Sequence, residues 1–206
     1  KRASVAAKEP AVQTTLASYE TAAELYVQRT ERGSTPAWQS FADQFVAKVP
    51  AGKILELGSG PGWHAAQLES KGLHVERSDG ADAFVRMMAA DGHAARKLDV
   101  VTDQYGGPYD GIVANAVLLH LNSQEFLSAV GKAAKALRSG GVFAFTLKEG
   151  DGEEWSDAKL NLPRYFKYWR ERDVRSSFDV AEWATVSIRS EIGRGRQPWL
   201  LVLADR

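Results

Sequence analysis

The 206-residue chain has no cysteine, which excludes disulfides, thiolate nucleophiles and zinc sites with cysteine ligands. It also lacks an apolar run of about 18 residues, the length that a membrane-spanning helix requires. No stretch has the charged, apolar and small-residue pattern of a secretory signal peptide. From these absences we expect a cytoplasmic protein that does not enter a membrane.

An excess of charge of either sign is absent as well. Lys plus Arg and Asp plus Glu each number 26, so the formal net charge is zero. This balance argues against a protein that binds nucleic acid through a globally basic surface. The length suits one α/β domain with a full core, and we expect residues 1–206 to form it. Within that domain we expect N-terminal helices over residues 1–48 and the core over residues 49–206.

The most informative segment is ILELGSGPG, residues 54–62. The apolar run 54–57 predicts a buried strand, and residues 63–69 have helical character. Between them lie three glycines spaced by two, which are Gly58, Gly60 and Gly62. A glycine-rich turn between a strand and a helix lets the backbone approach a ligand and points free N–H groups toward it. Because buried carboxylates need partners, we expect Glu56 to face a cationic ligand or the N–H groups of this loop.

The spacing of these glycines distinguishes two nucleotide-binding motifs. The dinucleotide fingerprint is G-x-G-x-x-G, whereas here the third glycine comes one residue early and Trp63 occupies the place of the fingerprint's last glycine. The form E-x-G-x-G-x-G instead resembles motif I of the class I, Rossmann-like methyltransferases that use S-adenosylmethionine. This resemblance implies that the loop binds the methionine half of that cofactor through Glu56, Gly58, Ser59, Gly60 and Gly62.

An acidic residue follows the next predicted strand, residues 73–77. Asp79 lies about twenty residues after the first glycine, the spacing at which α/β nucleotide sites place a ribose-binding acid. A carboxylate there accepts hydrogen bonds from both ribose hydroxyls and disfavours a 2′-phosphate. We therefore expect Asp79 and the adjoining Gly80 to bind the cofactor. The alternative is that Asp79 caps a helix that starts near Ala81.

A second acidic residue follows a third predicted strand, residues 95–98. The resemblance implies that Asp99 meets the adenine amino group and that the backbone N–H of Val100 meets the adenine ring. A plain turn residue would give the same pattern at Asp99, so that alternative stays open.

The fourth predicted strand, residues 109–115, ends in the region that resembles motif IV of the same family. The resemblance implies that Asn115 lies beside the transferred methyl group. His120 follows in the next loop, and a neutral imidazole there is suited to take a proton from the methyl acceptor. The alternative is that His120 is a structural residue that holds the loop.

The C-terminal half supplies the remaining sheet elements. Asn122 and Glu125 form a capping-box pattern before a helix, which Gly140 and Gly141 are expected to end ahead of the strand 142–147. Two further strands, 185–192 and 199–203, are joined so closely that they must be antiparallel. The resemblance implies a doubly wound, mostly parallel seven-stranded α/β sheet, order 3-2-1-4-5-7-6, with helices on both faces.

The N-terminal segment predicts two helices, over residues 15–29 and from Thr35-Pro36 onward. The resemblance implies that they cover the cofactor and shape the acceptor pocket. We expect Tyr26, rather than Tyr19, to lie over the methionine end of the cofactor. Equally, both tyrosines suit a hydrophobic core at helical spacing.

Segments 148–155 and 164–170 resemble a bacterial subgroup of small methyltransferases whose substrates are mostly unassigned. Lys148, Glu153 and Arg164 are candidates for a charged network at the rim of the site, and Tyr165 and Phe166 for an apolar acceptor wall. The basic and aromatic residues of 164–178 are also compatible with RNA stacking. Acidic residues interrupt that segment, which favours a solvated amphipathic helix.

Taken together, the motifs predict an S-adenosylmethionine-dependent methyltransferase that releases S-adenosylhomocysteine. We expect in-line displacement by an oxygen or nitrogen atom of a small-molecule acceptor, by a monomer or homodimer without a metal. The alternatives are a non-catalytic S-adenosylmethionine-binding module, an RNA methyltransferase and an NAD-linked oxidoreductase.

Overall fold

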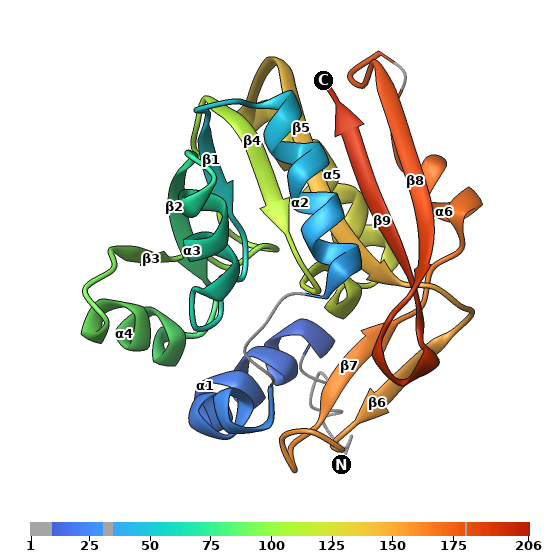
Figure 1. The fold of residues 1–206 in the computed structure, drawn as a ribbon. Helices are drawn as coiled ribbons and strands as arrows, with labels where there is room; N and C mark the ends of the chain where they lie inside the picture. Colours follow the sequence, from blue (N-terminus) through green and yellow to red (C-terminus); the bar gives the residue numbers. More distant parts are fainter. Residues whose placement is uncertain (1–9, 31–34, 180) are drawn as a thin grey trace, which may run out of the picture.

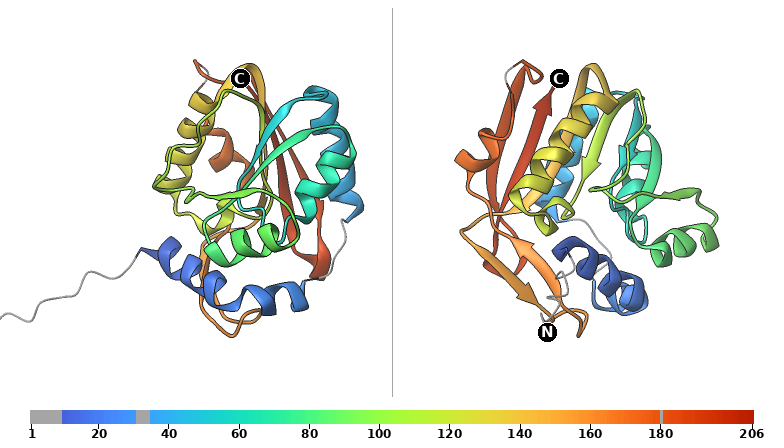
Figure 2. Two further views of the ribbon diagram at one scale, coloured as in Figure 1. Left: turned by 90° about the vertical axis from the view of Figure 1, so that its left-hand side faces the viewer. Right: turned by 180° about the vertical axis from the view of Figure 1, so that it is seen from behind.

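The computed structural model describes residues 10–30, 35–179 and 181–206. A mixed sheet runs through the centre of the molecule, and helices cover both of its faces (Figure 1; Figure 2). The helices are α1 (Ala11–Arg29), α2 (Pro36–Lys48), α3 (Trp63–Ser70), α4 (Asp82–Ala90), α5 (Ser123–Ala136), α6 (Glu171–Arg175) and the 3₁₀ helices η1 (Leu118–His120) and η2 (Arg194–Arg196). The strands are β1 (Lys53–Glu56), β2 (His74–Asp79), β3 (Ala95–Lys97), β4 (Tyr109–Ala114), β5 (Leu137–Lys148), β6 (Glu153–Ser156), β7 (Arg164–Lys167), β8 (Thr185–Ile192) and β9 (Pro198–Asp205).

The main sheet has seven strands in the order β3-β2-β1-β4-β5-β9-β8. The first five pair in parallel, whereas β9 is antiparallel to both β5 and β8. Since β8 and β9 are the sixth and seventh strands of this sheet along the chain, the predicted order and the antiparallel C-terminal hairpin are confirmed. The carboxyl ends of the parallel strands meet at the lower edge in Figure 1. Ligands of open α/β sheets bind at this edge.

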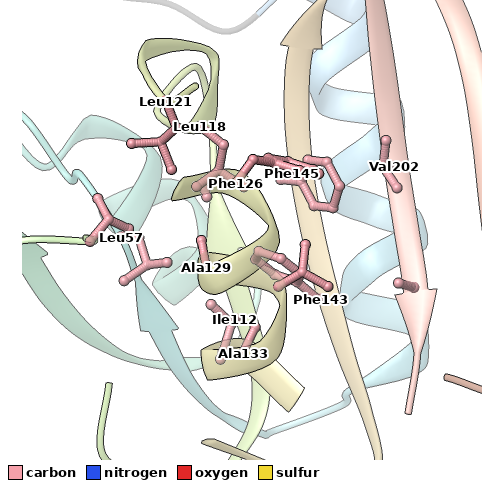
Figure 3. Packing of buried hydrophobic residues seen from close by; sticks show 14 of the residues in the cluster. Leu57, Ile112, Leu118, Leu121, Phe126, Ala129, Ala133, Phe143, Phe145 and Val202 are labelled. Atoms are coloured by element: carbon pink, nitrogen blue, oxygen red, sulfur yellow. The ribbon is translucent and has the colours of Figure 1, made fainter. Parts of the chain in front are cut away.

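Alternate residues along the strands pack on opposite faces of the sheet. One cluster joins Leu55, Ile112 and Phe143 to α5, as Figure 3 shows for the latter two. The other cluster joins Ile54 and Val113 to α2 and α3. These two packed layers hold the strands rigidly, so the loops at the carboxyl edge start from fixed positions.

Both predicted helix caps are present. The Thr35 hydroxyl accepts a hydrogen bond from the Trp38 N–H at 3.2 Å at the start of α2. Asn122 accepts one from the Glu125 N–H, and the Glu125 carboxylate accepts one from the Asn122 N–H, which completes the capping box of α5. The cap at Thr35 places the first turn of α2 at the carboxyl edge of the sheet.

The end of α5 differs from the prediction. The helix ends at Ala136 rather than at the glycine pair, because Leu137 is already extended, with φ −83° and ψ 144°. Leu137 pairs with Tyr109 and buries its side chain in the core, and a register shift between Tyr109 and Gly111 absorbs the extra residues of β5. Core burial of Leu137 therefore overrides the helical periodicity that continues through it.

The prediction of an amphipathic helix over 164–178 is wrong for most of its length. Arg164 to Lys167 form β7, which pairs antiparallel with β6, and only Glu171–Arg175 are helical. Three consecutive side chains, Arg164, Tyr165 and Phe166, are buried, which no single face of a helix allows. The β6–β7 pair forms a separate small sheet beside α1 (Figure 1).

Helix α1 lies across the carboxyl edge of the sheet and is kinked at Ala22. On one side it joins β7, since Thr15 Oγ1 accepts a hydrogen bond from the Tyr165 N–H at 3.0 Å. On the other side it joins α4, since Glu20 accepts one from the Ala83 N–H at 2.7 Å. Helix α1 therefore bridges two elements at this edge. Among the described residues, no helix combines the length and the apolar character needed to cross a bilayer.

Candidate functional site

The glycine loop after β1 has the backbone that its sequence predicts. Gly58, Gly60 and Gly62 have φ values of +64°, +54° and +81°, in the left-handed region that disfavours other residues. At Gly58 there is also no room, because a Cβ would lie 2.4 Å from the Val117 side chain. Ser59 fixes the loop to β2, since its N–H donates to the Ser78 carbonyl at 2.8 Å. Gly62 directly precedes the first residue of α3.

Glu56 is buried at the end of β1, beneath this loop. Burial raises the pKa of its carboxyl to about 7, although a hydrogen bond with Ser59 and the charge of Arg77 act in the opposite direction. Its Oε2 atom has no hydrogen-bond partner among the described residues. A buried carboxylate oxygen without a partner suits a cationic ligand group.

Asp79 is tied to the glycine loop from the end of β2. Its Oδ2 accepts a hydrogen bond from the Gly60 N–H at 2.8 Å, and its Oδ1 accepts one from the Ala81 N–H at 2.9 Å. Burial raises the pKa of this carboxyl to about 6, while the backbone hydrogen bonds oppose that shift. Each carboxylate oxygen has a second lone pair, so Asp79 can still accept hydrogen bonds from a ligand.

A small cavity lies between the glycine loop, the ends of β2 and β4, and helix α1. Its volume is about 90 Å³, below the roughly 300–1,000 Å³ that is usual for small-molecule pockets. The predicted site residues on its wall are Tyr26, Gly58, Gly60, Asp79, Gly80, Val100, Asn115 and His120. The structure therefore brings most of the predicted residues together. Glu56, Ser59, Gly62 and Asp99 lie outside this lining.

Two side chains of α1 contact the loops at this cavity. The Gln13 amide donates a hydrogen bond to Asp99 Oδ2 at 2.9 Å. Leu16 packs so close to Gly80 that a Cβ there would lie 2.7 Å from Leu16 Cδ2. Asp99 also shapes its own turn, since its Oδ1 accepts a hydrogen bond from the Val101 N–H at 2.8 Å. The Asp99 carboxylate thus has the contacts of the turn alternative and, in addition, holds an amide donor.

His120 is buried at the other end of the small cavity. Its Nδ1 lies 2.6 Å from the Tyr165 carbonyl, which only accepts, so Nδ1 carries the proton. Its Nε2 therefore accepts the hydrogen bond from the Tyr19 hydroxyl at 3.1 Å. Burial lowers the pKa of the imidazole to about 4. Both ring nitrogens are engaged, which favours the structural alternative; the role of base for His120 stays a prediction.

Tyr19 and Tyr26 pack edge to face, with ring centroids 5.6 Å apart, and both line the small cavity. Tyr19 is also held by Arg164, whose guanidinium donates to its hydroxyl at 3.2 Å. Burial raises the pKa of Tyr26 to about 12, so its hydroxyl is neutral near pH 7. The placement of Tyr26 over the methionine end stays a prediction.

A larger cavity of about 450 Å³ lies at the same edge of the sheet, next to the small one. It is bordered by the first turn of α2, the start of α3, the end of β5 and the β8–β9 hairpin. Asn115 and Ala116, directly after β4, line both cavities and form their common wall. The aromatic, polar and charged side chains on its wall include Trp38, His64, Thr146, Lys148, Glu191 and Trp199.

Sequence reasoning missed most of this second cavity. His64 follows the third glycine by two residues, so the glycine motif itself places it on the first turn of α3 at the ligand edge. Thr146 is the one polar residue in the apolar segment 142–147 of β5, a signal that was available in the sequence. Trp38 and Trp199 carried no such signal, because only the packing of distant segments brings them to this wall.

The rim differs from the predicted network. Lys148 lies 3.9 Å from Glu154, whereas Glu153 pairs with Lys167 at 3.4 Å. Arg164 is not part of this network, because its guanidinium donates a hydrogen bond to the Tyr19 hydroxyl on α1. The predicted acceptor wall is also corrected: Tyr165 and Phe166 are buried but line neither cavity. In the described ranges, no group of three or more His, Asp or Glu side chains is arranged to hold a metal ion.

Comparison with known proteins gives one family match. The sequence profile of the methyltransferase domain family matches residues 29–186. No curated protein matches the chain.

Solved structures with this fold include methyltransferases of small molecules. The 1,6-didemethyltoxoflavin-N1-methyltransferase of Burkholderia thailandensis, with bound 1,6-didemethyltoxoflavin and S-adenosylhomocysteine, has a TM-score of 0.72 and 17% identity, over 100% of this chain and 93% of that one. Magnesium protoporphyrin IX methyltransferase from Synechocystis PCC 6803, with bound S-adenosylmethionine, has a TM-score of 0.76 and 13% identity, over 98% of this chain and 100% of that one.

Proposed function

Because this chain belongs to the methyltransferase domain family and is a class I, S-adenosylmethionine-dependent methyltransferase, we propose that it methylates an oxygen or nitrogen atom of a small molecule. One observation carries the proposal. The small cavity, which has the buried Asp79 carboxylate on its wall, and the larger cavity share the wall formed by Asn115 and Ala116. A cofactor on one side and an acceptor on the other would meet at that wall.

The groups in and around the small cavity suit the charge and the polar groups of the cofactor. S-adenosylmethionine has a cationic ammonium group and a cationic sulfonium, and Glu56 offers a buried carboxylate oxygen that has no partner among the described residues. The loop residues Gly58, Ser59, Gly60 and Gly62 would hold the methionine part, and Asp79 with Gly80 the ribose. The remaining assignments are Asp99 and Val100 to the adenine, and Asn115 and Tyr26 to the methionine end.

When bound, the cofactor supplies a methyl group on a sulfonium sulfur, which keeps the electron pair of the broken bond. The chain's own contribution is to hold the acceptor atom in line with that methyl group at the common wall. Holding two reactants in such a geometry can supply most of the rate when the leaving group is good. In-line displacement therefore needs no metal and no covalent enzyme intermediate.

The larger cavity favours a small acceptor. Its volume of about 450 Å³ lies inside the range typical of small-molecule pockets. The two structural neighbours described above are named for the methylation of 1,6-didemethyltoxoflavin and of magnesium protoporphyrin IX. The zero net charge gives no support to an RNA substrate. A non-catalytic S-adenosylmethionine-binding module has no need of a second cavity that shares the wall of Asn115 and Ala116 with the first.

Calorimetric titration with S-adenosylhomocysteine tests the cofactor assignments. We expect binding in the micromolar range and no binding of NAD. Asp79→Asn keeps the size of the side chain but removes its charge and one acceptor oxygen, so we expect at least about tenfold weaker binding. His93→Gln, at an exposed position, is the matched control and should bind like the wild type.

Two results would count against the proposal. If well-folded protein does not bind S-adenosylhomocysteine, all of the cofactor assignments are contradicted. Unchanged affinity in Asp79→Asn would remove the ribose assignment alone. Methyl transfer itself is then followed with tritium-labelled S-adenosylmethionine and a panel of phenols and nitrogen heterocycles.

A further inference from the structure

The imidazole of His64 lies on the wall of the larger cavity and has no place in the cofactor assignments. We propose that His64 accepts the proton that the methyl acceptor loses, and that Thr146 and Asn115 are positioning residues that orient it. The acceptor would be a flat, largely apolar molecule with an O–H or ring N–H group at its edge. This inference rests on the proposed function and names the chemistry of its acceptor site.

The direction of three hydrogen bonds orients the Asn115 amide. The backbone N–H of Ala116 donates to Thr146 Oγ1 at 2.9 Å. The Thr146 hydroxyl therefore directs its own proton to Asn115 Oδ1, at 2.7 Å. With its oxygen engaged there, Asn115 turns its Nδ2 toward His64. An amide N–H donates, so whichever ring nitrogen of His64 accepts it, Nε2 or Nδ1, is the unprotonated one.

The surroundings of His64 keep its ring neutral. The Trp38 indole packs on it with a centroid distance of 4.6 Å, and burial lowers the pKa of the imidazole to about 4. The Trp38 indole N–H donates to Gln67 Oε1 at 2.8 Å, so Trp38 does not compete for the lone pair of His64. The charged side chains on the wall of this cavity are Lys148 and Glu191.

The contact between His64 and Asn115 is weak enough for a ligand to replace it. Asn115 Nδ2 lies 3.3 Å from Nε2 and 3.5 Å from Nδ1 of the imidazole, distances that mark a weak hydrogen bond. At His120, by comparison, both nitrogens have closer partners. An acceptor O–H or N–H at the common wall can therefore replace Asn115 as the partner of the His64 lone pair. The Asn115 amide then remains free to donate to the same acceptor atom.

A weak base is sufficient for this task. As the acceptor atom bonds to the methyl carbon, it becomes positively charged and its proton becomes strongly acidic. That proton moves to the ring nitrogen of His64, and the imidazolium, with its low pKa, returns the proton to water. The aromatic walls formed by Trp38 and Trp199 favour a flat body for the acceptor.

Two probes that differ by one methyl group test the inference by binding alone. At about pH 5.5, where 4-nitrophenol is un-ionised and His64 is still neutral, 4-nitrophenol has the O–H that His64 would accept, and 4-nitroanisole lacks it. In protein loaded with S-adenosylhomocysteine, we expect calorimetry to show about tenfold tighter binding of 4-nitrophenol, the value of one neutral hydrogen bond. We expect His64→Gln to abolish this preference and to leave the affinity for S-adenosylhomocysteine unchanged. His93→Gln serves as the surface control.

The positioning role has its own readout. Thr146→Val removes the hydroxyl that fixes the Asn115 amide, so we expect the ¹⁵N signals and pKa of the His64 ring to change in NMR titrations. Thr146→Ser restores the hydroxyl and should restore both. Equal preference in wild type and His64→Gln, or binding of neither probe by the loaded protein, overturns the inference. If the protein fails to bind S-adenosylhomocysteine at all, that result contradicts the proposed function rather than the role of His64.

Discussion

Glu56 places a carboxyl group inside the protein directly beneath the glycine loop, where burial raises its pKa to about 7. The folded chain therefore binds the proton of Glu56 more tightly than the unfolded chain, in which the pKa is near 4.5. A raised acid pKa contributes stability that is fully present below about pH 4.5 and is lost as the pH rises through about 7. In the absence of a ligand, Glu56 thus makes folding less favourable at neutral and alkaline pH.

Replacing Glu56 by glutamine removes this titration at nearly constant size. Between pH 5 and 8, we expect the stability of Glu56→Gln to rise relative to wild type by up to about 3 kcal/mol. Urea unfolding midpoints across that range measure the effect. Glu24→Gln, at an exposed position of α1, is the control, and its stability should depend on pH in the same way as that of the wild type. A Glu56→Gln curve that also runs parallel would refute the assignment of the raised pKa to Glu56.

Residues whose role depends on local backbone geometry were predictable from the sequence. Gly58 and Gly60 adopt positive φ because the turn between β1 and α3 requires it, and spacing alone indicates such a turn. The partners of Asp99 and His120 were not predictable, because Gln13 and Tyr19 lie far from them along the chain. For His64, the position at the ligand edge follows from the motif, but the orientation of Asn115 toward it depends on Thr146.

At the scale of elements, α1 forms one wall of the small cavity that we assign to the cofactor. It is held to β7 through Thr15, to Pro163 directly before β7 through Ser18, to the residues of α4 through Glu20, and to the loop after β3 through Gln13. In this arrangement the cleft retains a cavity of about 90 Å³. Because this volume is small for a cofactor of drug-like size, we expect α1 or its side chains to shift when the cofactor binds. The hydrogen bond from Gln13 occupies the Asp99 carboxylate, which we assign to the adenine amino group.

We expect Gln13→Ala to strengthen the binding of S-adenosylhomocysteine by up to about tenfold, because the adenine no longer has to displace an amide from a charged group. The gain should be mainly in the association rate, which stopped-flow fluorescence measures. Gln28→Ala, an exposed glutamine on the same helix, is the matched control. Weaker binding in Gln13→Ala would instead mean that Gln13 contributes to the bound complex.

The elements themselves were predictable where one period dominates. The alternating pattern of β8 and the apolar run of β9 predicted an antiparallel hairpin, and the capping box marked the start of α5. The prediction failed at β7, because its sequence of charged and aromatic residues, RYFK, follows neither the helical nor the strand period. There the extended form is selected by pairing with β6 and by the hydrogen bond from Tyr165 to Thr15, neither of which is a local property.

At the scale of the whole molecule, the cleft joins parts of the chain that are otherwise separate. Helix α1, the loop after β1, the end of β2 and the loop after β4 all line the small cavity. His120 extends this connection to β7 through its hydrogen bond to the Tyr165 carbonyl. A ligand in the cleft therefore contacts segments that must all fold before the site exists, and its binding energy is added to the stability of the folded state.

We expect S-adenosylhomocysteine at 100 times its dissociation constant to stabilise the fold by about 2.7 kcal/mol, through mass action on the native state alone. For a chain of this size, that energy corresponds to a rise in melting temperature of about 5–10 °C. Differential scanning calorimetry measures it, with NAD as the ligand control and Asp79→Asn as the variant in which the same concentration gives a smaller rise. Because the cleft links α1, β2, β4 and β7, the transition should shift as a single peak. A shift confined to a low-temperature shoulder would show that α1 unfolds independently and that the cleft does not join these elements into one cooperative unit.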